Sequence, residues 1–243
     1  SDIKGLAYRD SNNNLKVTGN ADQIPQSELK YTDWERLKST LGDKGWLVDE
    51  LFDNVKDHPV FINTKFYEKN INKKIAKIDL SKGCVARCTF CQRATKGYRV
   101  YGLNTLDAYV KNLKEKFDVA GIEINDENFG SNKKQAYEFA KIMKSNDLFW
   151  TSNATRTTTF DLEDLKFLKE HNLVNIKFGI ESGSQKILDI MEKKANTEDI
   201  YNSIERCAKL GIRSEPDALM LGMPGETRQT VIESSQFIAS LRR

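Results

Sequence analysis

The sequence predicts an α/β fold in which parallel strands form a partial (β/α) TIM-like barrel, preceded by an irregular lead-in. From about residue 75, short strand-like runs alternate five times with amphipathic helical patterns. This order is typical of βαβ units with right-handed crossovers. The strand-like runs alternate apolar and polar residues, whereas residues 1–72 are rich in Asn, Asp and Lys and show no clear period. We therefore divide the chain into a lead-in, 1–72, and a core, 73–243.

Each element of the core follows from its local pattern. The predicted strands are residues 75–80, 119–124, 148–152, 174–180 and 212–221. The helical patterns cover residues 106–117, 136–143, 162–168, a short segment from about 184, 197–211 and 226–241. Their apolar residues recur at i, i+3 and i+4, the spacing of a buried helix face. Asp161 is a suitable N-cap, and Gly211 is a suitable residue just after a helix end.

The strands differ from those of a fully packed barrel. In the fourth strand Val174, Ile176 and Phe178 face one way, while Asn175 and Lys177 face the other. A parallel strand covered on both faces reads as continuously apolar, and a closed eight-stranded barrel fills its interior with branched apolar side chains. We interpret the pattern as a curved, incompletely closed barrel whose polar face lines a wet cavity. The alternative is an error of one residue in the strand register.

Composition excludes several classes of protein. The chain has 243 residues, with 38 basic and 35 acidic side chains and a net charge of +3. This balance does not favour nucleic acid as a partner. No stretch approaches the ~20 apolar residues of a membrane span. The two histidines, His58 and His171, are expected at the surface, so histidine-rich metal chemistry is nearly excluded.

Three of the four cysteines fall within eight residues, as Cys84, Cys88 and Cys91 in a C-x3-C-x2-C pattern. Three thiolates on one loop can hold an iron–sulfur cluster and leave one iron open to a ligand. Zinc is the competing interpretation, although a closed zinc site needs a fourth ligand that is not evident nearby. Three unrelated buried cysteines are the remaining alternative. Cys207 lies at an apolar helical position, and we expect it in the core.

The C-x3-C-x-aromatic-C pattern directly after a first strand resembles the radical S-adenosylmethionine (SAM) superfamily. The resemblance implies that Cys84, Cys88 and Cys91 bind a 4Fe–4S cluster, with SAM filling the fourth position. It also implies that the backbone near Phe90 contacts adenine. Reductive cleavage of SAM then yields a 5′-deoxyadenosyl radical. The resemblance further implies an electron donor such as flavodoxin or ferredoxin and a small-molecule substrate. We also expect a cytoplasmic location.

Further motifs at the strand ends resemble the same superfamily. Asp126 or Glu127, after the second strand, matches the position that binds the SAM amino group, and a solvated acidic turn is the alternative. Arg156, after the third strand, matches an arginine that meets the SAM carboxylate, and a surface arginine is the alternative. The fourth strand ends Gly-Ile-Glu181-Ser182-Gly, where hydroxyl and carboxylate groups suit ribose, although the serines also suit a capping turn. Gly222 lies in a Gly-Met-Pro-Gly-Glu-Thr segment that resembles one flanking adenine, and the alternative is a helix start.

The resemblance covers residues from about 75 to 243 and is closest to the cobalamin-binding subgroup. The lead-in is similar to the linker that follows a cobalamin-binding domain. The Asp-x-His-x-x-Gly signature of that domain is absent from the sequence, so we expect cobalamin only through a domain outside this chain. The superfamily core has six strands, and the sequence predicts five. We expect a radical SAM core that acts on a polar substrate, with methyl transfer among the reactions it could catalyse. The alternatives are a non-catalytic zinc-binding module and an inactive truncated scaffold.

Overall fold

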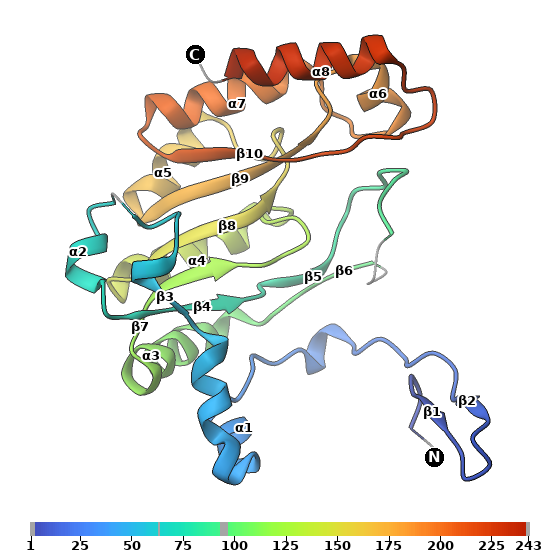
Figure 1. Ribbon diagram of the computed structural model, residues 1–243. Helices are drawn as coiled ribbons and strands as arrows, with labels where there is room; N and C mark the ends of the chain where they lie inside the picture. Colours follow the sequence, from blue (N-terminus) through green and yellow to red (C-terminus); the bar gives the residue numbers. More distant parts are fainter. Residues whose placement is uncertain (1–2, 63, 93–96, 242–243) are drawn as a thin grey trace.

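The computed structural model describes residues 3–62, 64–92 and 97–241 (Figure 1). Its main sheet contains five parallel strands in the order β10-β9-β8-β7-β4, and the short antiparallel strand β3 pairs with β4. The bounds are β3 Asp53–Asn54, β4 Lys74–Ile78, β7 Val119–Ile124, β8 Phe149–Thr155, β9 Leu173–Glu181 and β10 Arg213–Leu219. The sheet is open between β3 and β10. The prediction of an incompletely closed parallel array is therefore confirmed.

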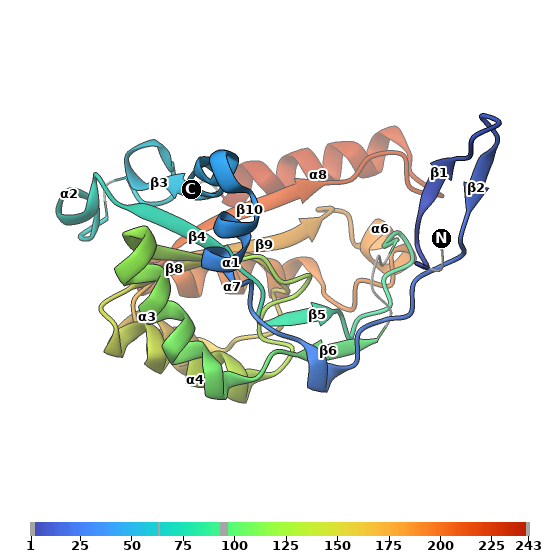
Figure 2. The ribbon, with the colours of Figure 1, turned by 90° about the horizontal axis from the view of Figure 1, so that it is seen from below.

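Helices connect successive parallel strands. They are α3 Leu106–Phe117, α4 Lys133–Ser145, α5 Leu162–Glu170, α6 Gln185–Ile190 and α7 Thr197–Lys209, and α8 Arg228–Leu241 follows the last strand. Figure 2 shows α3 and α4 together on one side of the sheet, and the lead-in helix α1 contacts α3 through a hydrogen bond from Trp34 Nε1 to the Tyr109 hydroxyl at 2.9 Å. Asp161 caps α5, and Gly211 follows α7 in the left-handed conformation with φ of 64°, as predicted. Among the described helices, none is long and apolar enough to cross a lipid bilayer.

The lead-in is more ordered than its composition suggested. It contains β1 Ala7–Arg9, β2 Leu15–Val17, α1 Trp34–Thr40 and α2 Tyr67–Asn70, with 3-10 turns at Gln26–Glu28, Gly42–Leu51 and Val55–Asp57. The hairpin of β1 and β2 projects from the body of the molecule in both views (Figures 1 and 2). A second hairpin, β5 Ser81–Gly83 with β6 Tyr98–Val100, brackets the cysteine loop, and a 3-10 turn at Leu103–Thr105 precedes α3. Strand β3 was not predicted, because two residues give no periodic signal.

The outer face of the sheet forms the main core. Ile122, Trp150 and Phe178 are fully or almost fully buried there, in one apolar cluster with residues of α3, α4 and α5. Aromatic rings interlock at the centre, with Phe139 edge-on to Trp150 at 5.0 Å between ring centroids. Burying large aromatic side chains contributes much of the stability of such a core.

The inner face of the sheet has two parts. One is a row of polar side chains that runs across the strands, called the polar row; the other is an apolar cluster, called the apolar floor. Strand register aligns Lys77 with Glu123, Glu123 with Thr151, and Thr151 with Asn175. Asn175 in turn lies opposite Arg213. The alternation predicted from the sequence is therefore confirmed. Toward the amino ends of the strands, the lead-in covers this face in a second apolar cluster, which comprises Val55, Val60, Phe61, Phe66, Ile75, Ala120, Phe149 and Val174.

A capping box at the start of α5 gives a first testable result. Asp164 accepts hydrogen bonds from Lys133 and Tyr137, and its side chain also closes the box with Asp161. Burial alone raises the pKa of Asp164, but the hydrogen bonds from Lys133 and Tyr137 outweigh it and hold the pKa below its ordinary value. The ionised form therefore stabilises the fold above the ordinary pKa, and this contribution is lost as the pH falls through the lowered pKa.

We expect Asp164→Ala to lower the free energy of unfolding by about 1 kcal/mol at pH 7, the usual magnitude for a lost cap. Urea unfolding at pH 7 and at pH values below the ordinary Asp pKa measures this, and the difference from the unmodified chain should shrink in acid. Glu163→Ala, on the exposed side of the same turn, is the control and should have little effect. An effect of Asp164→Ala that does not change with pH would contradict the role assigned to the carboxylate.

Candidate active site

The cysteine loop lies at the carboxyl ends of the parallel strands, beside α6 (Figures 1 and 2). The Thr89 N–H donates to the carbonyl of Met191 at 2.9 Å, and the Thr89 hydroxyl donates to the carbonyl of Ile190 at 3.0 Å. A tight turn follows, in which the Cys91 N–H donates to the Cys88 carbonyl at 3.2 Å. These bonds fix the loop to the end of α6. Ligand sites in parallel α/β folds lie at this edge of the sheet.

The cysteine side chains are accessible to a metal centre. Cys84 and Cys88 are half-buried and Cys91 is exposed. Among the described residues, one triad of possible ligand atoms lies within 4.8 Å, and it is not the cysteine triad. A single tetrahedral zinc ion with Zn–S bonds of ~2.3 Å needs sulfurs under ~4 Å apart. A four-iron cluster binds each thiolate to a different iron and suits wider spacing. The three sulfurs are therefore spaced more widely here than in a closed zinc site.

Arg156, just beyond β8, connects the cysteine loop with the segment after β7 and with the loop between α6 and α7. Its Nη1 donates to Cys88 Sγ at 3.4 Å, and its Nη2 donates to the carbonyl of Lys193. The backbone N–H of Arg156 donates to Oδ1 of the buried Asn128 at 3.1 Å, just beyond β7. The predicted arginine is therefore next to a predicted cluster ligand.

Glu181 belongs to the same network through a residue that the sequence analysis missed. Lys193 Nζ lies 2.9 Å from Glu181 Oε1, and their side chains are 8% and 13% exposed. The same ammonium group lies 5.8 Å from the centroid of the Phe90 ring. Glu181 adopts the left-handed region with φ of 62°, a conformation that is strained for a non-glycine residue and is often found at functional sites. Lys193 occupies a loop between α6 and α7, where no periodic pattern marks it.

The two carboxylates after β7 have different surroundings. Asp126 is buried and accepts hydrogen bonds from the Leu80 N–H at 2.7 Å, the Ser81 N–H at 3.1 Å and the Ser81 hydroxyl at 2.6 Å. Burial raises its pKa, and these hydrogen bonds offset only part of that effect. Glu127 is exposed, and its Oε1 accepts from the Gly83 N–H at 3.2 Å. Asp126 thus anchors the chain entering the cysteine loop, while Glu127 retains open acceptor capacity.

Ser182 and Gly222 occupy positions away from the Arg156 network. Ser182 is buried, and its hydroxyl lies 3.1 Å from that of Ser234 on α8. The neighbouring Gly183 lies so close to α8 that an added Cβ would meet the Ser234 backbone at 2.8 Å. Gly222 lies in the exposed loop before α8 with φ of 87°, and its N–H donates to Glu226. Both segments therefore position α8.

The expectation that both histidines lie at the surface is wrong for His58. Its side chain is only 12% exposed, and its Nε2 lies 2.8 Å from Oε2 of the buried Glu123. His171 is half-buried and stacks on Phe167, one helical turn earlier, with ring centroids 4.0 Å apart. A long-range contact places His58 inside, and a lone histidine in an irregular segment carries no sequence signal for such a partner. Cys207, by contrast, is fully buried as predicted.

The fold is a partial-barrel core of parallel strands, with three thiols on the loop that follows the first parallel strand. The sequence profile of the Radical SAM superfamily matches residues 78–238. The chain belongs to that superfamily, whose enzymes use a 4Fe–4S cluster and SAM.

Individual proteins show the same relationship. The chain is 28% identical over 166 residues to an uncharacterized methyltransferase, PH0819, of Pyrococcus horikoshii, covering 66% of this chain and 36% of that protein. It is 23% identical over 232 residues to the cytidylyl-2-hydroxyethylphosphonate methyltransferase of Streptomyces wedmorensis, covering 92% and 43%. The structure of the cobalamin-dependent radical SAM enzyme OxsB superimposes with a TM-score of 0.68 at 15% identity, covering 97% and 32%. The chain thus spans well under half the length of each.

Proposed function

We propose that this chain holds a 4Fe–4S cluster through Cys84, Cys88 and Cys91, binds SAM beside it, and cleaves SAM reductively to a 5′-deoxyadenosyl radical that abstracts hydrogen from a substrate. The observation that carries the proposal is the position of Arg156. It contacts one of the three cysteines and joins the ends of β7, β8 and β9 in a single network. These are the segments that the superfamily resemblance assigns to the two cofactors.

The residues of this network have distinct roles in the proposal. Arg156 has N–H donors beyond the two that contact Cys88 and Lys193, and its planar fork suits the SAM carboxylate. Glu127 is the better candidate for the SAM amino group, because the Asp126 carboxylate is occupied by three donors. Glu181, held by Lys193, faces the ribose in this arrangement. Ser182 supports α8, and Gly222 lets the following loop approach adenine.

The inner face of the sheet indicates the substrate class. Its polar row of Lys77, Glu123, Thr151 and Asn175 suits a small polar molecule. Two similar proteins are named as methyltransferases, which favours methyl transfer as the reaction. Cobalamin would then be supplied by a domain outside this chain. In this proposal the chain acts in the cytoplasm, where an electron donor such as flavodoxin or ferredoxin reduces the cluster. The zinc alternative is disfavoured by the spacing of the thiols.

Anaerobic reconstitution with iron and sulfide tests the proposal. The reconstituted chain should be brown and contain about four irons. With a reductant and SAM it should release methionine and 5′-deoxyadenosine in equal amounts. A colourless protein that retains zinc, or a cluster-loaded protein that leaves SAM intact, would contradict the catalytic role.

Arg156→Ala should separate SAM binding from cluster binding. We expect the dissociation constant of SAM to rise at least about tenfold, the effect of one lost charged hydrogen bond. Iron content should remain near that of the parent chain. Titration calorimetry of the reconstituted protein measures the affinity. Arg87→Ala is a matched control, since Arg87 is an exposed arginine on the cysteine loop, between Cys84 and Cys88. Equal losses in both variants would exclude the specific role of Arg156.

A further inference from the structure

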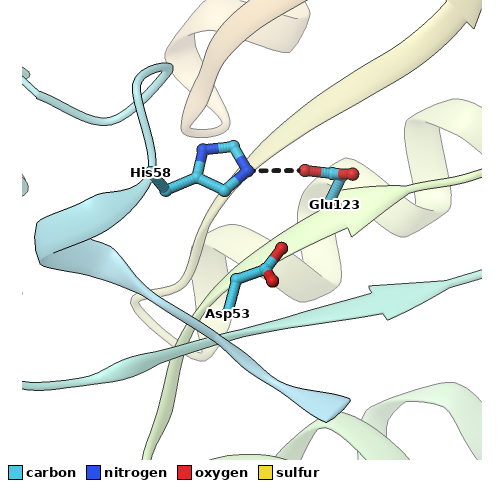
Figure 3. Close-up of side chains that lie close together, drawn as sticks. All are labelled: Asp53, His58 and Glu123. Carbon is cyan, nitrogen blue, oxygen red and sulfur yellow. Dashed lines mark hydrogen bonds and ion pairs between the residues drawn. The ribbon is translucent and has the colours of Figure 1, made fainter. Parts of the chain in front are cut away.

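A second group of metal-binding side chains lies on the inner face of the sheet, apart from the cysteine loop. Asp53 comes from β3, His58 follows the turn Val55–Asp57, and Glu123 comes from β7. One ligand atom from each lies within 4.8 Å of the others. Figure 3 shows the His58 ring and the Asp53 carboxylate directed toward Glu123. Three elements, two of them from the lead-in, therefore converge on one point.

The arrangement is fixed in advance of any ligand. Glu123 accepts from His58 Nε2 at 2.8 Å on one oxygen and from Asn153 Nδ2 on the other. The His58 ring also packs against Phe61 in the apolar floor, with centroids 4.9 Å apart. Burial raises the pKa of Glu123, but the hydrogen bonds from His58 and Asn153 outweigh burial and leave the pKa lowered. Hydrogen bonds to a ligating side chain, such as the one from Asn153, orient the ligands of a metal.

An unsatisfied acceptor adjoins the group and is an independent sign of a missing ligand. Asn153 Nδ2 donates to Glu123, while Asn153 Oδ1 is buried and has no hydrogen-bond partner among the described residues. Asn175 Oδ1, two strands further along the same polar row, is also buried and unpaired. Native proteins pair nearly all buried polar atoms. The unpaired Asn153 oxygen next to Glu123 favours a cation as the missing partner.

Charge and access agree with this interpretation. The two carboxylates lie near Lys77, whose Nζ is 2.9 Å from Asp53 Oδ2. Exposure rises from 7% at Glu123 and 12% at His58 to 41% at Asp53 and 47% at Lys77. One side of the group is therefore open to solvent. Lys77 can turn outward and release Asp53, so it competes with an entering ion without blocking it.

We propose that Asp53, His58 and Glu123 form a site for a divalent transition-metal ion of the Zn²⁺ class. Nε2 and two carboxylate oxygens supply three ligands, and water supplies a fourth, a donor set that zinc accepts. Ligand atoms around such an ion lie about 3.4 Å apart, so the exposed Asp53 carboxylate moves inward on binding. The imidazole proton shifts from Nε2 to Nδ1, and the Glu123 hydrogen bond is replaced by the ion. The site does not involve the cysteine loop, and it shares Glu123 with the polar row of the inner face.

The test uses the full chain carrying C84A, C88A and C91A, so that no thiolates compete for the ion. Titration with Zn²⁺ by calorimetry, with metal analysis after desalting, should give one equivalent per chain. His58→Ala in this background should lose that equivalent. His171→Ala is the matched control, since His171 is the other histidine of the chain, and should retain it. Lys77→Met should tighten binding about fivefold, because it frees Asp53 and removes a neighbouring positive charge.

Two results would overturn the proposal. The first is a chain without the three loop cysteines that takes up no zinc, and the second is equal zinc binding by His58→Ala and His171→Ala in that background. If circular dichroism shows that His58→Ala is unfolded, Asp53→Asn on the exposed rim decides the question. Its zinc affinity should fall at least about tenfold, and an unchanged affinity would refute the site.

Discussion

Alanine at Cys84, Cys88 or Cys91 is expected to abolish the four-iron cluster. Each thiolate in the proposed site binds a separate iron, and the loop offers no substitute sulfur or imidazole nearby. The substituted chains should therefore remain nearly colourless after anaerobic reconstitution and should lose all release of 5′-deoxyadenosine. The visible absorbance of the cluster and the iron content per chain measure the effect. Thermal unfolding of the unreconstituted chains should change little, because Cys84 and Cys88 are only half-buried and Cys91 is exposed.

Cys207→Ala is the control for this experiment. Cys207 is fully buried in α7, and burial raises the pKa of its thiol to about 12. It therefore stays protonated and cannot ligate iron at neutral pH. The control should cost about 1 kcal/mol of stability through the small cavity it leaves, and it should bind iron normally. A cluster that survives the loss of any one loop cysteine would contradict the three-thiolate site.

Asp126 and Glu127 are expected to separate into a structural and a binding role. Asp126→Ala leaves the Leu80 N–H, the Ser81 N–H and the Ser81 hydroxyl without their acceptor. A buried donor without a partner costs about 1–3 kcal/mol, so we expect the free energy of unfolding to fall by about 3 kcal/mol. Urea unfolding of the unreconstituted protein measures it.

Glu127→Ala should lower stability by less than about 1 kcal/mol, because the residue is exposed. Its effect should appear instead in the SAM affinity of the reconstituted protein, with a dissociation constant raised at least about tenfold. Asp126→Asn keeps an acceptor oxygen and should recover part of the lost stability. If Asp126→Ala folds normally and loses only SAM affinity, the assignment of the two carboxylates is reversed.

The regular part of the fold was predictable because its signals are local. Strand alternation and helical stripes in residues 75–243 yielded all five parallel strands and their helices, and even the Asp161 cap. Strand β3 escaped prediction because its two residues are defined only by pairing with Ile75 and Lys74. The lead-in was underestimated for the same reason. Phe61 and Phe66 are buried against side chains of the sheet, such as Phe149, and these side chains come together only when the sheet forms.

The candidate site was predictable where chemistry is concentrated in a short motif. The cysteine spacing and the strand-end segments are enough to identify the loop, Arg156 and Glu181 as candidates. Lys193 and the His58–Glu123 pair were missed because their partners lie 12 and 65 residues away in the chain. Spacing within a motif cannot distinguish Asp126 from Glu127 either. That distinction depends on which carboxylate meets the backbone of Leu80 and Ser81.

The order of the main sheet has a consequence for how the chain acquires its structure. The strands of the main sheet lie side by side in the order in which they occur in the sequence, from β3 through β4, β7, β8 and β9 to β10. No strand has to wait for a partner synthesised much later, so each new βα unit can dock on a sheet edge that is already complete. Folding rates fall as contacts become more distant in the sequence. We therefore expect the sheet to grow in one direction, starting from the lead-in, as the chain leaves the ribosome.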